Sequence, residues 1–423
     1  MLDIKYIREH ADEVKQNITL RRSSADIDRL LQVDETRLKA LQRIEDLRRL
    51  RNEVAEQMKT VSADHRTELI EAGKKLKGEL ATLEAAYEPL DAEWKQLMYQ
   101  IPNKTHPATP DGASDEDNAE LTQWGSTERP AFDPRSHVEL AKMHDLMDFD
   151  RAAKVTGAKF YFLKGKLALL EQALIRYGID FAMREGFELL TTPDLAKEEV
   201  LVGKGFQPRG PETQVYYIQG QDLALIGSAE ATVLGYHMKE TLPAEEMPKK
   251  YVAFSHCFRT EAGSYGRESY GLYRVHQFSK VEMFAFANAD QSEAIHLEFL
   301  RLEEAFWQSL GIPYRVVDCS SGDLGGSDYR RYDIEAWMWG KNEGKGGWGE
   351  VTSTSNCTDF QSRALEIKAR TKEGEREYVH TLNGTMVATP RAMISILENH
   401  QQADGSILIP EILRPYCGFD KIG

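Results

Sequence analysis

The sequence predicts an α+β protein in which an N-terminal antiparallel helical coiled coil precedes a domain built on a mostly antiparallel sheet flanked by helices. Three observations support this: heptad spacing of apolar residues between 27 and 100, prolines and acidic residues gathered just after it, and helical mixed with alternating segments further on. With 423 residues, the chain is long enough for two domains. We expect one domain at 1–103, a linker at 104–135 and a second domain at 136–423.

The segment at 27–100 is predicted to be a helical hairpin about 50 Å long, at about 1.5 Å per residue. Its first half spaces apolar residues by alternating steps of four and three, and its second half carries a leucine at every seventh position, namely Leu69, Leu76, Leu83, Leu90 and Leu97. A polar turn near residues 62–65 separates the halves. Pro89 lies inside the second half, where a proline costs about 3 kcal/mol or kinks the helix. The spacing fits a spacer or dimerising coiled coil as well as an arm that contacts a large partner.

Five of the chain's 15 prolines lie between residues 101 and 134, around an acidic stretch, which indicates a linker. Beyond it, the predicted helices are Leu167–Arg184, Ile295–Leu310 and Pro390–His400, and the predicted strands are Tyr251–Arg259, Leu272–Ala287, Tyr314–Cys319, Arg331–Trp337, Trp348–Asn356 and Tyr378–Leu382. Because strands follow one another through turns as well as through helices, a mostly antiparallel sheet is expected.

Composition excludes several classes of protein. No apolar run approaches the 18 residues of a membrane span, and the acidic residues near the start exclude a secretory signal. The four cysteines are far apart, so neither a zinc ribbon nor a disulfide framework is expected, and the cytoplasm is the expected compartment. The net charge of −15 means that any contact with nucleic acid must use local basic patches.

One candidate site follows the strand that ends near Arg259 and Glu261. On the predicted return strand, Arg274, Phe278 and Glu282 recur at steps of four, so they share one face of the sheet. A cation, an aromatic ring and a carboxylate in this order could stack a base and hold phosphates. A salt-bridged, exposed sheet face remains the alternative.

A second candidate is the start of the helix predicted near residue 390. Thr389 suits its N-cap and Pro390 its first position, which places Arg391 in the first turn. A basic residue there opposes the helix dipole, so its position makes more sense with an anion nearby. A surface arginine that tolerates its position is the alternative.

A third candidate is the run that contains Glu350 and Ser353. Glu350 could ligate a Mg²⁺ ion held by phosphates. Strand alternation places Ser353 on the opposite face, so a shared site would need a β-bulge or a backbone contact.

Together these segments resemble seryl-tRNA synthetases, a class II aminoacyl-tRNA synthetase family, over essentially the whole chain. The similar segments are Met1–Glu9, the hairpin with its exit Ile101–Asn103, Phe258–Ser264 with Arg274–Phe278 as class II motif 2, and Thr381–Gln401 as motif 3. The resemblance implies a tRNA-binding N-terminal arm, a class II catalytic domain at 136–423 and a homodimer with Pro193 at its interface.

The resemblance also implies roles for individual residues. Arg259 and Arg391 would be catalytic, and ATP would contact Arg259, Thr260, Glu261, Arg274, Val275, Phe278, Glu350, Val351, Thr352, Ser353 and Arg391. Serine would contact Ser228, Ala229, Glu230, Glu282 and Thr385, and Glu350 with Ser353 would hold Mg²⁺.

The activity implied by the resemblance is ATP-dependent ligation of L-serine to the 3′ end of serine tRNA through a seryl-adenylate. The same family implies serine charging of selenocysteine tRNA where that tRNA is present. The implied partners are serine, ATP with Mg²⁺, serine tRNA and a second copy of the chain; zinc, DNA and a membrane are not expected.

The chain departs from the family pattern at three positions. Ser228 stands where the family usually has Thr, Thr385 where many bacterial members have Ser, and Pro390 where Gly is frequent. Both hydroxyls are kept, and the packing of one methyl group is about 1 kcal/mol, which can tune selectivity without abolishing binding. A variant that resists serine-mimicking inhibitors or accepts a related amino acid therefore stays open.

Two rival functions are compatible with this kind of fold. A paralogue that loads an amino acid onto a carrier protein would be expected to lack the arm, which this chain has. A catalytically silent RNA-binding relative would be expected to lose the motif arginines, whereas Arg259 and Arg391 are both present.

Overall fold

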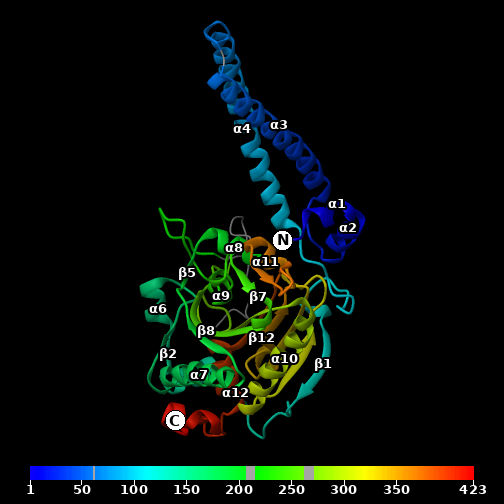
Figure 1. The fold of residues 1–423 in the computed structure, drawn as a ribbon. Helices are drawn as coiled ribbons and strands as arrows, with labels where there is room; N and C mark the ends of the chain where they lie inside the picture. The colour runs from blue at the N-terminus through cyan, green and yellow to red at the C-terminus, as the bar shows by residue number, and fades with distance from the viewer. Residues whose placement is uncertain (61, 206–214, 262–270) are drawn as a thin grey trace. The chain divides into compact units, whose positions relative to one another are not determined.

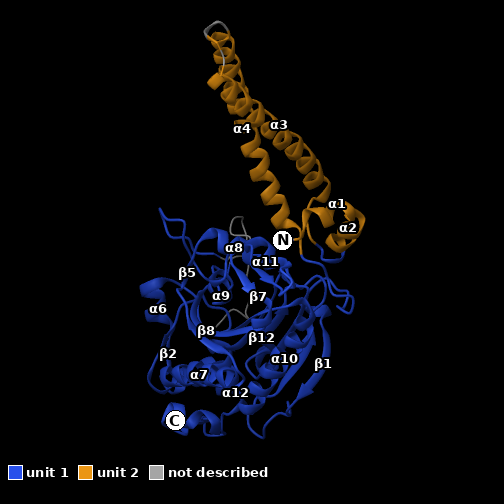
Figure 2. Cartoon of the chain, viewed as in Figure 1, with its two compact units in different colours: residues 1, 20–22, 103–423 blue, residues 2–19, 23–102 orange. Residues whose placement is uncertain are grey.

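The computed structural model describes residues 1–60, 62–205, 215–261 and 271–423. They form two compact units, coloured separately in Figure 2. The smaller unit contains residues 2–19 and 23–102, and the larger unit contains residues 1, 20–22 and 103–423.

The smaller unit is helical. Its helices are α1 (Ile4–Glu9), α2 (Ala11–Leu20), α3 (Ile27–Thr60) and α4 (Ala63–Gln100), and α3 packs along α4 as an antiparallel hairpin (Figure 1). The predicted coiled-coil hairpin is therefore confirmed. Helix α4 begins right after its N-cap Ser62, so it includes residues 63–65, which were expected in the turn. It continues as one helix on both sides of Pro89.

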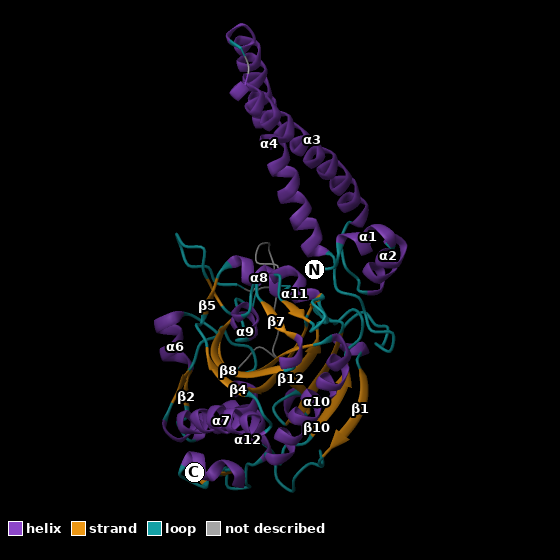
Figure 3. Cartoon of the chain, viewed as in Figure 1, coloured by secondary structure: helices purple, strands orange, loops and turns teal. Residues whose placement is uncertain are grey.

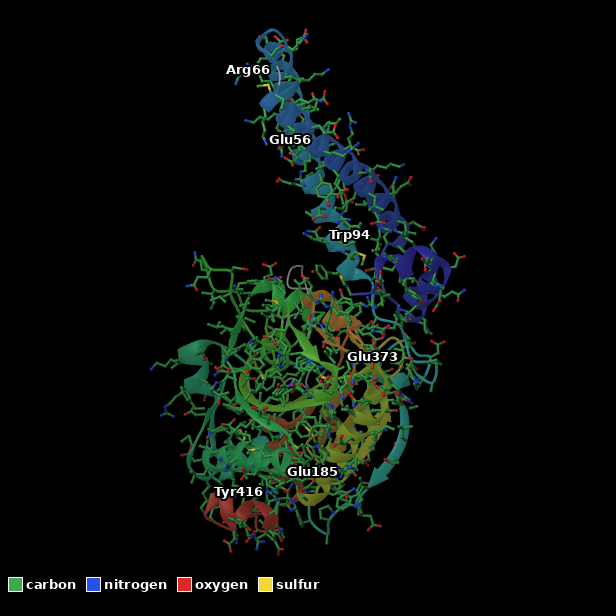
Figure 4. All side chains as sticks on the ribbon, in the orientation of Figure 1. Glu56, Arg66, Trp94, Glu185, Glu373 and Tyr416 are labelled. Atoms are coloured by element: carbon green, nitrogen blue, oxygen red, sulfur yellow. The ribbon has the colours of Figure 1, made fainter. Side chains whose placement is uncertain are left out.

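The predicted heptad seam is the contact between α3 and α4. Ile44, Leu47 and Leu80 are buried there, and Leu76, Leu83 and Tyr87 pack against them. Ion pairs flank the seam, at 2.7 Å between Arg37 and Asp91 and at 2.7 Å between Arg48 and Glu84. Polar side chains point outward along both helices, including Glu56 and Arg66 (Figure 4).

The larger unit is built on an eight-stranded sheet flanked by helices (Figure 3). Its strands, in spatial order, are β1 (Ala119–Trp124), β10 (Tyr314–Asp318), β11 (Arg330–Met338), β12 (Gly347–Asn356), β15 (His380–Ala388), β9 (Gln277–Ala287), β8 (Lys249–Phe258) and β4 (Glu188–Thr191). All neighbours are antiparallel except β4 and β8. This confirms the predicted fold class.

Three long helices pack against this sheet, namely α7 (Gly165–Arg184), α10 (Ser292–Ser309) and α12 (Thr389–Asn399). The shorter helices are α5 (His137–Met143), α6 (Phe149–Thr156), α8 (Glu198–Lys204), α9 (Glu230–Tyr236), α11 (Phe360–Leu365) and α13 (Arg414–Cys417). The small sheets use β2 (Met147–Asp148), β3 (Phe162–Leu163), β5 (Leu195–Ala196), β6 (Ala224–Leu225), β7 (Thr241–Pro243), β13 (Lys368–Arg370), β14 (Arg376–Tyr378), β16 (Ile407–Leu408) and β17 (Lys421–Ile422). No helix within the described ranges is long and apolar enough to cross a membrane.

Side chains alternate along β9 and divide the sheet into two faces. Val281 and Met283 are fully buried in the main core, where α7 and α12 lie side by side (Figure 1). Phe278, Lys280 and Glu282 alternate with them and therefore face the opposite side of the sheet.

Three local expectations differ from the structure. Strand β9 begins only at Gln277, so Arg274 lies in the turn before it and does not share the strand face. Thr389 is the first residue of α12 rather than its N-cap, and its hydroxyl donates to Glu171 Oε1 at 2.8 Å, with the Ser279 carbonyl as a longer alternative acceptor at 3.2 Å. The segment expected as a linker contributes the edge strand β1, which pairs with β10.

The contact between α7 and the sheet gives a stability prediction. A Cβ on Gly178 would lie 2.9 Å from Val387 Cγ1, whereas a Cβ on Gly78 of α4 would meet nothing within 4 Å. Gly178→Ala should lower the free energy of unfolding by about 1–3 kcal/mol through overpacking. Gly78→Ala should instead stabilise α4 by about 0.5–1 kcal/mol. Thermal unfolding followed by circular dichroism tests this, and equal shifts for the two variants would contradict the close packing of α7.

Candidate functional site

A cleft of about 200 Å³ opens where β8, β9, β12 and β15 meet the start of α12. Its walls are formed by Arg259, Glu261, Leu272, Tyr273, Arg274, Val275, Phe278, Lys280, Glu350, Val351, Thr352, Thr385, Ala388, Pro390 and Arg391.

Most of the residues proposed from sequence meet in this cleft. Its walls include Arg259, Glu261, Arg274, Val275, Phe278, Glu350, Val351, Thr352, Thr385 and Arg391. Thr260, Ser353, Ser228, Ala229, Glu230 and Glu282 are outside this set of wall residues. Within the motif that resembles class II motif 2, Ala262, Gly263 and Ser264 lie outside the described residues.

Arg259 and Phe278 form one side of the cleft. The Arg259 guanidinium carbon lies 5.3 Å from the centre of the Phe278 ring, because β8 and β9 pair up to Phe258 and Gln277 and bring the two side chains together. The backbone N–H of Arg259 donates to the His276 carbonyl at 3.0 Å. Its Nε is buried, and no described residue accepts a hydrogen bond from it. A cation with an unused buried donor is suited to an anionic ligand.

Arg391 and Glu350 form the other side. Arg391 Nη1 lies 3.2 Å from Glu350 Oε1 and donates to the Glu350 carbonyl at 2.8 Å. The guanidinium also lies 4.9 Å from the centre of the Tyr273 ring. Since the Arg391 side chain is only 21% exposed and faces the cleft, it is not a tolerated surface arginine.

The charge of Glu350 is stabilised by its surroundings. Desolvation would raise its pKa, but the guanidinium groups of Arg391, Arg331 and Arg259 outweigh that effect and lower the pKa below its ordinary value. Glu350 is therefore an ionised carboxylate at neutral pH, with 46% of its side chain exposed.

The bulge that a joint role of Glu350 and Ser353 requires is present. Glu350 pairs with Glu335 and Thr352 pairs with Ile334, which leaves Val351 as the extra residue of β12. Val351 and Thr352 are buried, whereas Glu350 is exposed and Ser353 is half-buried. The bulge therefore leaves the two oxygen donors as the more accessible side chains of this run.

A buried polar group adjoins the cleft on β9 and β15. Glu282 forms an ion pair with Lys280, and Lys280 Nζ donates to Thr385 Oγ1 at 3.4 Å. Burial raises the pKa of Glu282, with Lys280 opposing this shift and Glu230 adding to it. Lys280 was missed by the sequence analysis, although strand alternation places it midway between Phe278 and Glu282 on the same face.

Glu230, at the start of α9, has its own set of partners. Its carboxylate forms an ion pair with Lys204 at 2.7 Å and accepts from Gln361 Nε2 at 2.9 Å and Asn383 Nδ2 at 3.4 Å. Ser228 and Ala229 precede it and are buried. The Ser228 hydroxyl has no hydrogen-bond partner within the described part of the chain, so a buried polar atom is left for a ligand.

Glu261 and Tyr273 are two further wall residues of the cleft. Glu261 adopts a positive φ of 49° and lies 3.5 Å from Arg274, which joins the strand end to the turn before β9. Tyr273 was not anticipated from sequence; Arg391 and Lys341 lie 4.9 Å and 4.6 Å from its ring centre. No sequence pattern distinguishes Tyr273 from the other tyrosines of the chain.

A separate group of possible metal ligands lies near β11. The ligand atoms of Cys319, Asp323 and Asp333 lie within 4.8 Å of one another. Arg331 is placed among them, 3.2 Å from the Cys319 sulfur, 2.5 Å from Asp323 and 3.0 Å from Asp333. The guanidinium therefore occupies the place among these groups that a metal ion would need.

Comparisons with known proteins agree over the whole chain. The family model of the seryl-tRNA synthetase N-terminal domain matches residues 1–105, and that of the tRNA synthetase class II core domain (G, H, P, S and T) matches residues 216–400. A serine–tRNA ligase of Treponema denticola is 47% identical, with 100% of both chains covered. A serine–tRNA ligase of Dictyoglomus thermophilum is 48% identical, with 100% of this chain and 99% of the relative covered.

Two solved structures have the same fold. Seryl-tRNA synthetase from Pyrococcus horikoshii, complexed with ATP, superposes with a TM-score of 0.87 at 36% identity, covering 100% of this chain and 99% of the other. Cytoplasmic serine–tRNA ligase from Naegleria fowleri, in complex with AMP, gives a TM-score of 0.82 at 29% identity, covering 100% and 98%.

Proposed function

The chain belongs to the seryl-tRNA synthetase family, and we propose that it joins L-serine to the 3′ end of serine tRNA through a seryl-adenylate formed in the cleft around Arg259 and Arg391. It is a class II aminoacyl-tRNA synthetase, an enzyme that ligates serine to tRNA with ATP. The observation that carries the proposed site is the convergence of Arg259, Phe278, Glu350 and Arg391 on a single cleft.

In the proposed ATP site, Arg259 holds the α-phosphate and the serine carboxylate, and Phe278 stacks on the adenine. Arg391 covers the other side of the base and reaches the γ-phosphate, while Glu261 contacts the adenine. The 5.3 Å contact between the Arg259 guanidinium and the Phe278 ring supports this, because it sets a phosphate-binding cation beside a stacking surface. Thr260, Arg274, Val275, Val351 and Thr352 complete the proposed set of ATP contacts.

The proposed serine site uses Ser228, Ala229, Glu230, Glu282 and Thr385. The unpartnered hydroxyl of buried Ser228 supports it, as do the two buried carboxylates. A carboxylate attracts the α-ammonium group of an amino acid, and a site built to bond a hydroxyl rejects the analogue that lacks it.

Class II synthetases use ATP with a divalent metal ion, and we assign Glu350 and Ser353 as the residues that would hold Mg²⁺ here. An ionised carboxylate and a hydroxyl are oxygen donors of the kind that Mg²⁺ prefers. The ion supplies neutralisation of phosphate charge when bound. In the described structure Arg391 is paired with Glu350, so nucleotide binding is expected to redistribute this guanidinium toward phosphate.

The proposed chemistry needs positioning and charge neutralisation more than a side-chain base. The serine carboxylate attacks the α-phosphorus in line and pyrophosphate leaves. The terminal ribose 3′-OH of tRNA then attacks the adenylate carbonyl, the bond between that carbonyl and the phosphate oxygen breaks, AMP leaves, and the hydroxyl proton is released. Arg259 and Arg391 would offset the negative charge that gathers on the phosphates during the first step.

We extend the proposal to a homodimer in the cytoplasm and to charging of selenocysteine tRNA with serine where that tRNA is present. The carrier-protein rival is disfavoured by the arm, and the silent-relative rival by the two arginines that line the cleft. Pyrophosphate exchange compared among serine, threonine, alanine and cysteine tests the assignment. A higher kcat/KM for another amino acid than for serine would contradict it.

Arg259→Ala should lower the rate of serine-dependent pyrophosphate exchange by about 10²–10³-fold, because it removes a donor aimed at charge that develops in the transition state. Arg301→Ala is the matched control, since Arg301 forms an exposed ion pair with Glu185 outside the cleft. Near-normal exchange by Arg259→Ala would refute the role proposed for this residue.

Deletion of residues 35–95 should spare pyrophosphate exchange and abolish aminoacylation of tRNA, because the hairpin and the cleft belong to different compact units. A short Gly-Ser turn would rejoin the remaining helix ends. Exchange and aminoacylation measured on the same preparation separate the two activities. Loss of both in a folded protein, or retention of both, would contradict a tRNA-binding arm.

Glu282→Gln should raise the KM for serine much more than the KM for ATP, because an amide replaces the acceptor of a buried charge-assisted hydrogen bond. Since burial raises the pKa of Glu282, its carboxylate takes up a proton at higher pH than an ordinary glutamate does. The wild-type KM for serine should therefore rise as pH falls, and the variant should lack this dependence. An equal increase in both KM values would argue against a role in serine binding.

A further inference from the structure

Lys280 connects two of the side chains proposed to bind serine. It lies on the cleft face of β9, and only 9% of its side chain is exposed. Its ammonium group forms an ion pair with Glu282 and donates to Thr385 Oγ1 at 3.4 Å. Thr385 and Glu282 are direct cross-strand partners of β15 and β9, so one cation bridges a register pair.

This bridge determines the direction of the hydrogen bonds. An ammonium group has three donors and no acceptor, so Thr385 Oγ1 must accept from Lys280 and use its own proton elsewhere. The Glu282 carboxylate has about four lone-pair positions, so it retains acceptor capacity after pairing with Lys280. The pair therefore presents one hydroxyl donor and one carboxylate acceptor side by side.

We propose that Lys280 is a positioning residue that orients Thr385 as a donor and Glu282 as an acceptor, so that the subsite fits a substrate alcohol, which needs both, better than a methyl group or a thiol. The inference rests on the proposed function, namely that serine binds at Glu282 and Thr385. It deepens that function by assigning the preference for an alcohol to Lys280, one of the wall residues of the cleft.

The charges around Glu282 support the same role. Burial and the neighbouring Glu230 raise the pKa of Glu282, and Lys280 and Lys204 oppose that shift; Glu303, on α10, is a further acidic neighbour. Without Lys280, Glu282 would hold a proton more readily and become a donor, which reverses the polarity that the alcohol requires.

Two variants of Lys280 separate its charge from its hydrogen bond. Lys280→Met removes both, whereas Lys280→Gln keeps an N–H donor for Thr385 and removes the charge. Lys250→Met is the matched control, because Lys250, on β8 of the same sheet, also pairs with a glutamate, Glu298 of α10 at 2.6 Å, but lies outside the cleft walls. The readouts are the kcat/KM values for serine, alanine and cysteine in pyrophosphate exchange, the KM for ATP and the melting temperature.

Lys280→Met should lower the serine-to-alanine ratio of kcat/KM by roughly 10- to 100-fold, the range expected for a charge-assisted hydrogen bond. The KM for ATP should stay near the wild-type value, and Lys280→Gln should lose less discrimination than Lys280→Met. A lower melting temperature with an unchanged serine-to-alanine ratio of kcat/KM would overturn the positioning role. An increase in the KM for ATP as large as the loss in kcat/KM for serine would overturn it as well.

Thr385→Val keeps the shape of the side chain and removes its hydroxyl, so it provides a second route to the same test. If Lys280 acts through Thr385, the double variant Lys280→Gln/Thr385→Val should lose less discrimination than the two single losses combined. Full additivity would overturn the inference, and this comparison holds even where Lys280→Met does not fold. If the wild-type protein shows no serine-dependent exchange, the proposed function itself is refuted. If the wild-type protein shows normal exchange and the Lys280 variants keep its serine-to-alanine ratio of kcat/KM, only the role of Lys280 is refuted.

Discussion

The alternation of side chains along β9 is the constraint on which the cleft depends. Val281 and Met283 are fully buried in the core beneath α7, and this anchors the strand in one register. Because the period is two, the residues between them, Lys280 and Glu282, must face the other side. A slip by one residue would exchange the two faces and place charges in the apolar core, so packing on one side of the sheet fixes the chemistry on the other.

The two carboxylates in and beside the cleft have pKa values shifted in opposite directions. Glu282 is buried beside a lysine and has a raised pKa, while Glu350 faces guanidinium groups and has a lowered one. Two carboxylates of one sheet thus differ in how readily they hold a proton, which agrees with the different ligands proposed for them: an amino acid for Glu282 and a metal ion with phosphates for Glu350. Arg259 differs from both, since its buried Nε has no acceptor among the described residues.

Sequence patterns predicted the parts of this protein that repeat with a short period. Heptad leucines gave the hairpin, and strand alternation placed Phe278 and Glu282 on one face. The same rule applied one step further would have found Lys280. Arg274 was misplaced because the hydrophobic pattern cannot show where a turn ends and β9 begins, and the bulge at Val351 could be stated only as a requirement. The approach of Tyr273 to Arg391 depends on tertiary packing of a turn against α12, which leaves no periodic trace.

Arg331 lies outside the cleft walls but also influences the charge of Glu350. It lies on β11, where Asp333 pairs with Ser353 of β12, and it holds Asp323 and Asp333 by charge-assisted hydrogen bonds. Its positive charge also contributes to the lowered pKa of Glu350. A metal ion bound among Cys319, Asp323 and Asp333 would have to displace this guanidinium and would strand a buried cation, which is costly without a partner. The guanidinium therefore links β11 to the loop that carries Asp323, and its charge helps keep Glu350 ionised at the edge of the cleft.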